Sequence, residues 1–339
     1  MSLRVQKNCS LAPHTTLKVG GEAAVFLVVT TKQELVEAIE YARTASLPIA
    51  LLGSGSNVLV VDSGFPGCVI KMDIRGRVVE DHGETVELSV GAGEMLDDVI
   101  AYSVENNLWG IENLSHIPGT VGATPIQNVG AYGVEVKDVI TRVTAFDTST
   151  NQFEVLNNDA CAFGYRDSLF KKEWGKKYII TEVTFLLSKK SNPKLTYTDL
   201  QKHFATEISV TQQKIRDAVI GIRSQKFPNW HEVGTAGSFF KNPIITSEKY
   251  TALLLEYPEL PGYMQGDSTV KISLGFVLDK ILNLRGYAEG NVRLYEHQAL
   301  VLVADTGATA KKIQLFAEKI IEQVKNKIGV TVEMEVTSL

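Results

Sequence analysis

Apolar and polar residues recur along the chain in patterns that predict both helices and strands. Residues 24–30 are apolar and rich in β-branched side chains, which favours a strand. Residues 31–42 begin with the spacing of a helical capping box and then place their apolar side chains on one face of a helix. The same helical spacing predicts helices over 94–106, 211–225 and 308–327.

Short apolar runs predict further strands, and two of these runs flank a glycine-rich loop. The runs cover residues 48–52, 58–61, 86–90, 141–146 and 178–187. No internal repeat or low-complexity tract is visible in the sequence. Together, these elements indicate an α+β fold.

Length and composition are those of an ordinary soluble protein with more than one domain. The 339 residues fit two or three domains, because single cores seldom grow beyond about 250 to 300 residues. Hydrophobic residues make up 44% of the chain and charged residues 22%, so a packed core is expected rather than disorder. No apolar run approaches the roughly 18 residues of a membrane span, and residues 1–16 lack the apolar core of a secretory signal. We therefore expect a cytoplasmic protein with no membrane partner.

Charge and metal-binding residue types exclude two further classes. The formal net charge of −5 argues against a nucleic-acid partner. The three cysteines share no CxxC spacing, and the six histidines form no HxxxH or HxH pair. We expect neither a disulfide framework nor a metal site.

Two glycine-rich segments are candidates for holding a cofactor. Gly53-Ser-Gly-Ser-Asn57 lacks both the third glycine of a dinucleotide fingerprint and the lysine of a P-loop, and a strand follows it. Its backbone N–H groups could still hold a phosphate, although such a loop is more often a tight turn. The irregular tract Ser115–Gly133 is a second candidate, and the alternative there is a close crossing of two chain segments.

Several polar residues could carry chemistry. Arg166 lies in Phe163-Gly-Tyr-Arg-Asp-Ser168 and could present its guanidinium to an anion, or pair with Asp167 at the surface. Ser238 follows a turn of small residues and precedes two aromatic residues, but no Gly-x-Ser-x-Gly elbow surrounds it, so it is not expected to be a hydrolase nucleophile.

The C-terminal segment and one helix offer further charged groups. Residues 331–336 alternate, so Glu333 and Glu335 would share one face of a strand, and either could enter a pocket. Arg223 and Lys226 lie three apart, which places both charges on one face of the helix, suited to a pyrophosphate or simply solvated.

In this order, the motifs resemble the UDP-N-acetylenolpyruvoylglucosamine reductase (UDP-N-acetylmuramate dehydrogenase) family over nearly the whole chain. They are Thr15-Thr-Leu-Lys-Val-Gly-Gly21, Gly53-Ser-Gly-Ser-Asn57, Ile117-Pro-Gly-Thr-Val-Gly-Ala123, Gln127-Asn-Val-Gly-Ala-Tyr-Gly133, Gly164-Tyr-Arg-Asp-Ser168, Gly237-Ser-Phe-Phe-Lys-Asn-Pro243 and Glu333-Met-Glu-Val336. Leu195-Thr-Tyr-Thr-Asp-Leu200 resembles a loop found in the family's longer subtype. Met334 stands where the family often has proline.

The resemblance implies a two-lobed FAD-binding region of the vanillyl-alcohol-oxidase (PCMH) type, followed by a substrate-binding α+β domain. It places the first lobe at residues 1–70, the second at 71–227 and the substrate domain at 228–328. Residues 329–339 would form a strand that returns to the active site.

The resemblance also implies roles for single residues. The implied catalytic residues are Arg166, Ser238 and Glu335. The implied FAD contacts are Gly53, Ser54, Gly55, Ser56, Asn57, Ser115, Ile117, Pro118, Gly119, Gly122, Ala123, Gly130, Tyr132 and Gly133. The implied substrate contacts are Tyr165, Tyr197, Arg223, Lys226, Asn242 and Gln298, with Tyr197 closing over the UDP-sugar.

The implied reaction is the reduction of UDP-N-acetylglucosamine enolpyruvate to UDP-N-acetylmuramate, by NADPH through non-covalent FAD, in peptidoglycan precursor synthesis. The enzyme would be a monomer whose product supports cell shape and division. Arg166 and a protonated Glu335 would stabilise charge on the α-carbon and its carboxylate, and Ser238 would protonate that carbon. The alternatives are a flavin oxidase of the same fold, which would react with oxygen, and a non-catalytic flavin- or nucleotide-sugar-binding module.

Overall fold

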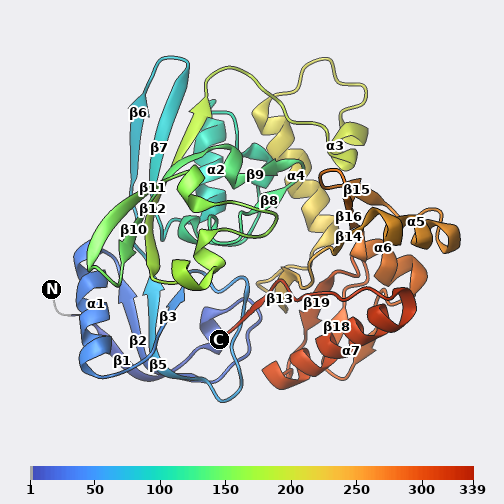
Figure 1. Cartoon of the computed structure of the whole chain (residues 1–339). Helices are drawn as coiled ribbons and strands as arrows, with labels where there is room; N and C mark the ends of the chain where they lie inside the picture. The colour runs from blue at the N-terminus through green and yellow to red at the C-terminus, as the bar shows by residue number, and fades with distance from the viewer. Residues whose placement is uncertain (1–2) are drawn as a thin grey trace. The chain divides into compact units, whose positions relative to one another are not determined.

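The computed structural model describes residues 3–339 and contains both helices and mostly antiparallel sheets (Figure 1). The helices are α1 (Lys32–Thr44), α2 (Leu96–Glu105), α3 (Thr198–His203), α4 (Gln212–Lys226), α5 (Ser247–Glu256), α6 (Leu274–Phe276) and α7 (Ala310–Ile328). The predicted α+β class is confirmed. Among the helices of the described residues, none combines the length and apolarity that crossing a membrane requires.

The chain forms two compact units, and each is built from separate stretches of sequence. The first comprises residues 1–8, 24–54 and 66–223, and the second comprises residues 9–23, 55–65 and 224–339. These units are not the consecutive segments expected from the sequence, because 9–23 and 55–65 pack with the C-terminal part. Leu17, Val19 and Leu59, for example, are buried in the core of the second unit.

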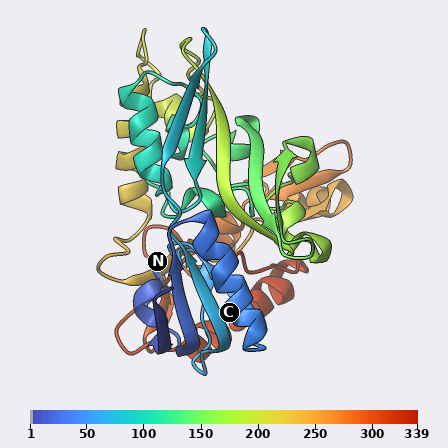
Figure 2. The ribbon, with the colours of Figure 1, turned by 90° about the vertical axis from the view of Figure 1, so that its left-hand side faces the viewer.

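A four-stranded sheet with helix α1 forms one part of the first unit. The strands lie in the order β1 (Val5–Ser10), β2 (Glu22–Val29), β5 (Phe65–Met72) and β3 (Ile49–Leu52), and β3 and β5 run parallel. Figure 2 shows α1 lying along this sheet, where its apolar face is buried. Thr31 caps α1 by accepting a hydrogen bond from the N–H of Glu34, as the capping-box spacing predicts.

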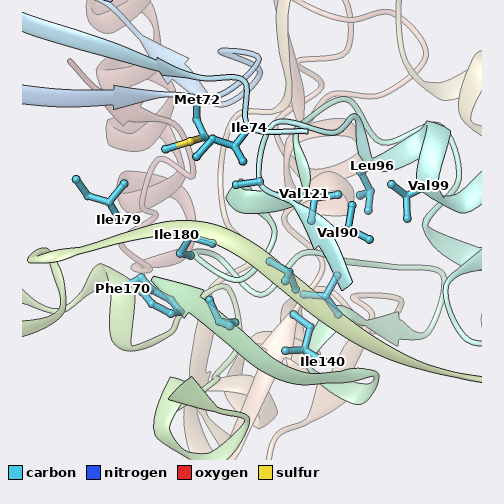
Figure 3. Close-up of a cluster of buried hydrophobic side chains, with 14 of the residues drawn as sticks. Met72, Ile74, Val90, Leu96, Val99, Val121, Ile140, Phe170, Ile179 and Ile180 are labelled. Carbon is cyan, nitrogen blue, oxygen red and sulfur yellow. The ribbon is translucent and has the colours of Figure 1, made fainter. Parts of the chain in front are cut away.

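A five-stranded antiparallel sheet forms the other part. Its strands lie in the order β11 (Gln152–Asn157), β10 (Ile140–Asp147), β12 (Tyr178–Ser188), β7 (Thr85–Gly91) and β6 (Arg77–Asp81). Val90, Ile140 and Ile180 from this sheet belong to the same buried cluster as Leu96 and Val99 of α2 (Figure 3). The cluster also contains Val121, so the core of this unit anchors the glycine-rich tract.

Short sheets and the long helix α7 form the second unit. One sheet has the order β13 (Gly234–Ser238), β19 (Val301–Ala304), β18 (Val292–Leu294) and β17 (Ala288–Glu289), and another has the order β14 (Ile244–Thr246), β16 (Thr269–Ile272) and β15 (Gly262–Met264). Asp62 accepts hydrogen bonds from the N–H groups of Ala310 and Lys311 at the start of α7. This contact ties the 55–65 segment to the C-terminal helix.

The C-terminal segment differs from its predicted form. Residues 331–336 make no continuous strand, only an isolated bridge between Met334 and Phe240, and the strand β20 comes later, at Thr337–Ser338. β20 pairs in parallel with β4 (Val58–Leu59). Val332 and Val336 are nevertheless buried, so the alternation reflects burial of side chains rather than strand pairing.

Candidate active site

Gly53, at the start of the first predicted glycine loop, meets the second loop inside the first unit. A Cβ atom on Gly53 would lie 2.4 Å from Oγ1 of Thr120, so only glycine fits against the second loop at this point. The hydroxyl oxygen of Ser54 is buried and has no hydrogen-bond partner within residues 3–339. Because buried polar atoms are normally paired, this oxygen indicates a place for a polar group of a ligand.

The start of the long tract is fixed on both sides of His116, whose φ of 62° is left-handed. Its N–H donates to Oδ1 of Asp97 at 2.6 Å, and its carbonyl accepts from Nε of Arg223 at 3.1 Å. Arg216 in turn holds Asp97 through two hydrogen bonds of 2.6 and 3.0 Å. Side chains of α2 and α4 thus set the conformation from which the Ile117–Ala123 loop begins.

Burial and charge shift the pKa values in this network. Burial and the neighbouring Arg223 lower the pKa of His116, so its ring is neutral at pH 7. Burial opposes ionisation of Asp97, but hydrogen bonds from Arg216 and from the His116 N–H outweigh it and lower its pKa. Burial lowers the pKa of Arg223, which is 9% exposed. Its Nε bond to the His116 carbonyl makes Arg223 a support for the main chain of the tract.

Close approach of the chain explains some of the tract's glycines. A Cβ on Gly122 would lie 2.6 Å from Cβ of Ala92, and the N–H of Gly122 donates to the carbonyl of Ala92. The crossing of two chain segments considered from the sequence therefore applies at Gly122. Gly119 has a φ of 148°, a conformation that side chains disfavour.

Arg166 lies against the end of the tract. Its Nη2 donates to the carbonyl of Gly130 at 2.9 Å, and its backbone has a left-handed φ of 51°, which is unusual for arginine. Asp167 pairs with Lys172 instead, so the surface pair between Arg166 and Asp167 is not formed. The guanidinium is held beside Gly130 rather than in solvent-exposed pairing with its neighbour.

Two tyrosines extend the same region of the first unit. The rings of Tyr132 and Tyr197 meet edge to face, with centroids 5.1 Å apart. Burial raises the pKa of Tyr132 to about 12, so its hydroxyl stays protonated at neutral pH. The Arg166 guanidinium lies 5.8 Å from the centroid of the Tyr165 ring. Tyr132, predicted as a cofactor contact, thus touches the predicted substrate residue Tyr197.

In the second unit, Asn57 and Glu335 are joined directly. The Asn57 side-chain amide donates to the carbonyl of Glu335 at 3.2 Å, and the N–H of Thr337 donates to the carbonyl of Asn57 at 3.1 Å. On its other side, the N–H of Glu335 donates to the carbonyl of Phe239 at 2.8 Å. The peptide groups on both sides of Glu335 are therefore fixed, and Glu335 lies next to the Ser238–Phe239 segment.

Ser238 is positioned by a bulge in β13. Pairing with β19 shifts register between Thr235 and Ser238, and Gly237 takes a left-handed φ of 71° within the bulge. The Thr235 hydroxyl donates to the carbonyl of Leu302 and accepts from the N–H of Gly237. This arrangement turns Ser238 out of the regular strand alternation.

The structure distinguishes the two C-terminal glutamates. The Glu333 side chain is 72% exposed and pairs with Lys241 at 2.7 Å, whereas the residue Glu335 is only partly exposed. The two glutamates thus differ in surroundings, and the role of Glu335 in catalysis stays a prediction.

Asn242 and Gln298, both predicted substrate contacts, lie close to α6. Oδ1 of Asn242 accepts from the N–H of Leu274 at 2.9 Å, and Oε1 of Gln298 would lie 3.2 Å from a Cβ on Gly275. Lys226 is the last residue of α4. Ser238 pairs with Val301, three residues after Gln298, so Ser238 and Gln298 lie near the same end of β19 in the second unit.

Sequence reasoning missed two residues that shape the site, Asp97 and Asn128. Asn128 is fully buried, and its amide donates to Glu135 and to the carbonyl of Gly164, which joins the tract to the Arg166 segment. An asparagine inside a glycine-rich tract and an aspartate in the first turn of α2 were the available signals. Neither signal identifies the distant partner, because Arg216 lies 119 residues from Asp97 and Gly164 lies 36 residues from Asn128.

No metal site was expected, yet one exposed group of possible ligands is present. Glu80, His82 and Glu87 each place one ligand atom within 4.8 Å of the others near the β6–β7 hairpin. Glu87 also pairs with Arg142. Exposed acidic groups of this kind are common without a metal.

Two family models of known proteins match this chain and identify its protein class. A family model described as an FAD binding domain matches residues 23–155, and the C-terminal domain model of UDP-N-acetylenolpyruvoylglucosamine reductase matches residues 228–339. With the two glycine loops and the buried Ser54 hydroxyl, these matches define a flavoprotein. It has an FAD-binding domain and, after it, a C-terminal domain of the reductase type. The predicted two-lobed FAD-binding region and following α+β domain are confirmed.

The relatives narrow the class to one family. UDP-N-acetylenolpyruvoylglucosamine reductase of Ralstonia nicotianae is 40% identical and that of Pseudomonas aeruginosa 38% identical, with alignments covering 96% and 99% of both chains. The crystal structure of the Thermus caldophilus reductase matches with a TM-score of 0.69 and 25% identity over 99% of each chain. The chain belongs to the UDP-N-acetylenolpyruvoylglucosamine reductase family.

Proposed function

We propose that this protein reduces UDP-N-acetylglucosamine enolpyruvate to UDP-N-acetylmuramate, with FAD as bound cofactor and NADPH as reductant. Membership of the reductase family over essentially the full chain supports the reaction. The single structural observation that supports it most is the join of Glu335 to the Ser238–Phe239 segment, through the bond from the Glu335 N–H to the Phe239 carbonyl. This bond brings the backbone of Glu335 next to the segment that carries Ser238, within one unit.

The residues present fit FAD as the cofactor. The Ser54 hydroxyl is buried and has no partner in the described part of the chain, and Gly53 and Gly119 keep the backbone open where side chains would block it. The backbone N–H groups of Gly53–Asn57 and Ile117–Ala123 would hold the pyrophosphate, and the tract through Gly133 would follow the flavin. FAD, when bound, supplies the two-electron transfer between NADPH and the enolpyruvyl double bond.

Three side chains would act on the substrate. As the β-carbon gains a hydride equivalent, negative charge develops on the α-carbon and its carboxylate. Arg166 would stabilise this charge by a charge-assisted hydrogen bond, and a protonated Glu335 would donate a second hydrogen bond. Ser238 would deliver the proton to the α-carbon, which requires a site that excludes water and a group that restores the serine proton.

Six further residues would contact the substrate, and the cellular location follows from the pathway. Tyr165, Tyr197, Arg223, Lys226, Asn242 and Gln298 would hold the UDP-sugar. The enzyme would work as a monomer in the cytoplasm, where its product enters peptidoglycan synthesis and thereby supports cell shape and division.

Steady-state turnover tests the proposal. Purified protein with FAD should oxidise NADPH over many turnovers only when UDP-N-acetylglucosamine enolpyruvate is present, and mass spectrometry should find a product heavier by two hydrogens. NADPH oxidation that depends on oxygen and not on the enolpyruvyl compound would indicate the flavin oxidase instead. Flavin binding without any NADPH oxidation would indicate a binding module.

A further inference from the structure

The segment between β12 and α4 contains Tyr197 and is mostly exposed. We call residues 189–203, from the end of β12 to the end of α3, the tyrosine loop. Residues 191–194 are all exposed, and Tyr197 itself is 43% exposed. A loop with so few buried side chains needs specific contacts to keep one position.

Asn113 connects this loop to the glycine-rich tract. Its side chain is 1% exposed, and its amide nitrogen donates to the carbonyl of Tyr132 and to the carbonyl of Lys194, both at 2.8 Å. Each of the two amide hydrogens thus serves a different segment of the chain. The Oδ1 atom of Asn113 has no hydrogen-bond partner in residues 3–339. The asparagine is therefore held in place by these two bonds and by packing.

The loop also rests on the tract through side chains. The Tyr197 ring meets the Tyr132 ring at 5.1 Å, and a Cβ on Gly133 would lie 3.2 Å from Oγ1 of Thr196. Leu200 and Phe204 are buried with Tyr132 in a small core. The tract and the loop thus meet at Tyr132, and Asn113 bonds the main chain on both sides of that contact.

Loss of the Asn113 amide would free the loop at this point. The carbonyls of Tyr132 and Lys194 would lose their donor. The Tyr132 carbonyl is buried, and an unpaired buried acceptor costs free energy unless the chain opens to water, whereas exposed Lys194 can turn its carbonyl to solvent. The exposed side of the contact is the tyrosine loop, because the Tyr132 side is buried in the core. The loop is therefore the part that would move.

We infer that Asn113 is a positioning residue that holds the tyrosine loop against Tyr132 and thereby sets the affinity for the UDP-sugar substrate. The inference rests on the proposed function through the role of Tyr197 as a substrate contact. Asn113 touches neither reacting group, so it acts only through the position of Tyr197.

Limited trypsin digestion tests the loop's attachment without any substrate. Lys190, Lys194 and Lys202 lie in the loop, and cleavage there requires the backbone to leave its folded position. In the FAD-bound full chain, Asn113→Leu, which is similar in size but has no donor, should be cut at these sites about tenfold faster. The matched control is Asn106→Leu, because exposed Asn106 bonds only within its own helix end and should leave cleavage unchanged. Asn113→Ser, which keeps one donor, should be intermediate and serves if Asn113→Leu does not fold.

Kinetics test the consequence for the substrate. The KM for UDP-N-acetylglucosamine enolpyruvate should rise about tenfold in Asn113→Leu, whereas kcat and the KM for NADPH should stay within about twofold. Unchanged loop cleavage would overturn the inference whatever the kinetics show. Faster cleavage with an unchanged substrate KM would overturn the link to affinity. If the unsubstituted protein does not reduce the enolpyruvyl compound at all, the proposed function fails, and the cleavage result still decides the role of Asn113.

Discussion

At the scale of single residues, unusual backbone conformations hold the candidate catalytic groups. Arg166 is left-handed at φ 51°, and Ser238 follows left-handed Gly237 within a β-bulge. Such conformations require support from the surrounding structure and are frequent at functional sites. The motifs of the sequence named these residues, but only the structure shows that Arg166 is held by the Gly130 carbonyl.

Replacing Arg166 should abolish most turnover and leave the fold intact. Loss of a donor aimed at developing charge lowers kcat by about 100- to 1000-fold, so Arg166→Gln should lose about that much in NADPH-dependent reduction. Thermal unfolding and flavin content should stay close to those of the unsubstituted protein. Arg142→Gln, at a salt bridge on the five-stranded sheet, is the control and should keep its activity. Full activity of Arg166→Gln would remove this residue from the mechanism.

The two C-terminal glutamates should respond differently to substitution. Glu335→Gln should reduce kcat by about 100-fold or more, because the amide cannot reproduce the carboxyl group that stabilises the developing charge. Glu333→Gln should change kcat less than about twofold, since Glu333 is exposed and forms a surface pair with Lys241. Steady-state assays measure kcat for both variants. A large loss of kcat in Glu333→Gln with little change in Glu335→Gln would assign the stabilising carboxyl group to Glu333.

Asn57 should matter for the position of Glu335. Asn57→Ala removes the hydrogen bond to the Glu335 carbonyl, so reoxidation of the reduced flavin by the enolpyruvyl substrate should slow by about tenfold. In the proposed mechanism Glu335 acts only on the enolpyruvyl substrate, so reduction of the flavin by NADPH should change less. Stopped-flow measurement of the two half-reactions separates the effects. Equal slowing of both, with weaker flavin retention, would mean that Asn57 acts only on the cofactor.

At the scale of elements, helices α2 and α4 fix the start of the long glycine-rich tract. Asp97 of α2 accepts from the N–H of His116, and Arg223 of α4 donates to its carbonyl. Arg216 of α4 holds Asp97 in turn. The loop proposed to contact FAD is thereby anchored to two helices, and each helix also buries apolar side chains on another face.

Asp97→Asn should weaken this anchor in a pH-dependent way. Because the folded-state pKa of Asp97 is lowered, its ionised form stabilises the fold above the ordinary carboxyl pKa of about 4, and this stabilisation is lost as pH falls through the lowered value. The unsubstituted protein should therefore unfold at a higher temperature than Asp97→Asn at pH 7, and the gap should narrow below about pH 4. Thermal unfolding across pH 3 to 7 measures it. A gap that does not depend on pH would exclude ionisation of Asp97 as its cause.

The helices and strands themselves were largely predictable from the sequence. Apolar spacing placed α1, α2, α4 and α7 within a few residues, because each buries one face against a core. The segment 331–336 was not predictable, since its alternation comes from burying Val332 and Val336 while the backbone bonds to Phe239 and Lys241 instead of forming a ladder. Periodicity reports which side chains are buried, not which backbone partner they find.

At the scale of the whole molecule, the order of motifs identified the family, but the composition of the units was not predictable. The second unit draws residues 9–23 and 55–65 from the N-terminal part, and β4 in the second of these segments pairs with β20 near the C-terminus. Local patterns carry no information about such distant pairing. The candidate site shows the same division: the motifs named Arg166, Ser238 and Glu335, whereas Asp97, Asn113 and Asn128, which hold the surrounding loops, became visible only through their distant partners.

The most direct test of the central claim is an anaerobic two-step experiment. The FAD-bound protein is first bleached with one equivalent of NADPH, and UDP-N-acetylglucosamine enolpyruvate is then added while flavin absorbance is followed. We expect the absorbance to return promptly, with one equivalent of UDP-N-acetylmuramate formed for each flavin reoxidised. A flavin that stays bleached until oxygen is admitted would contradict the reductase account and point to an oxidase of this fold.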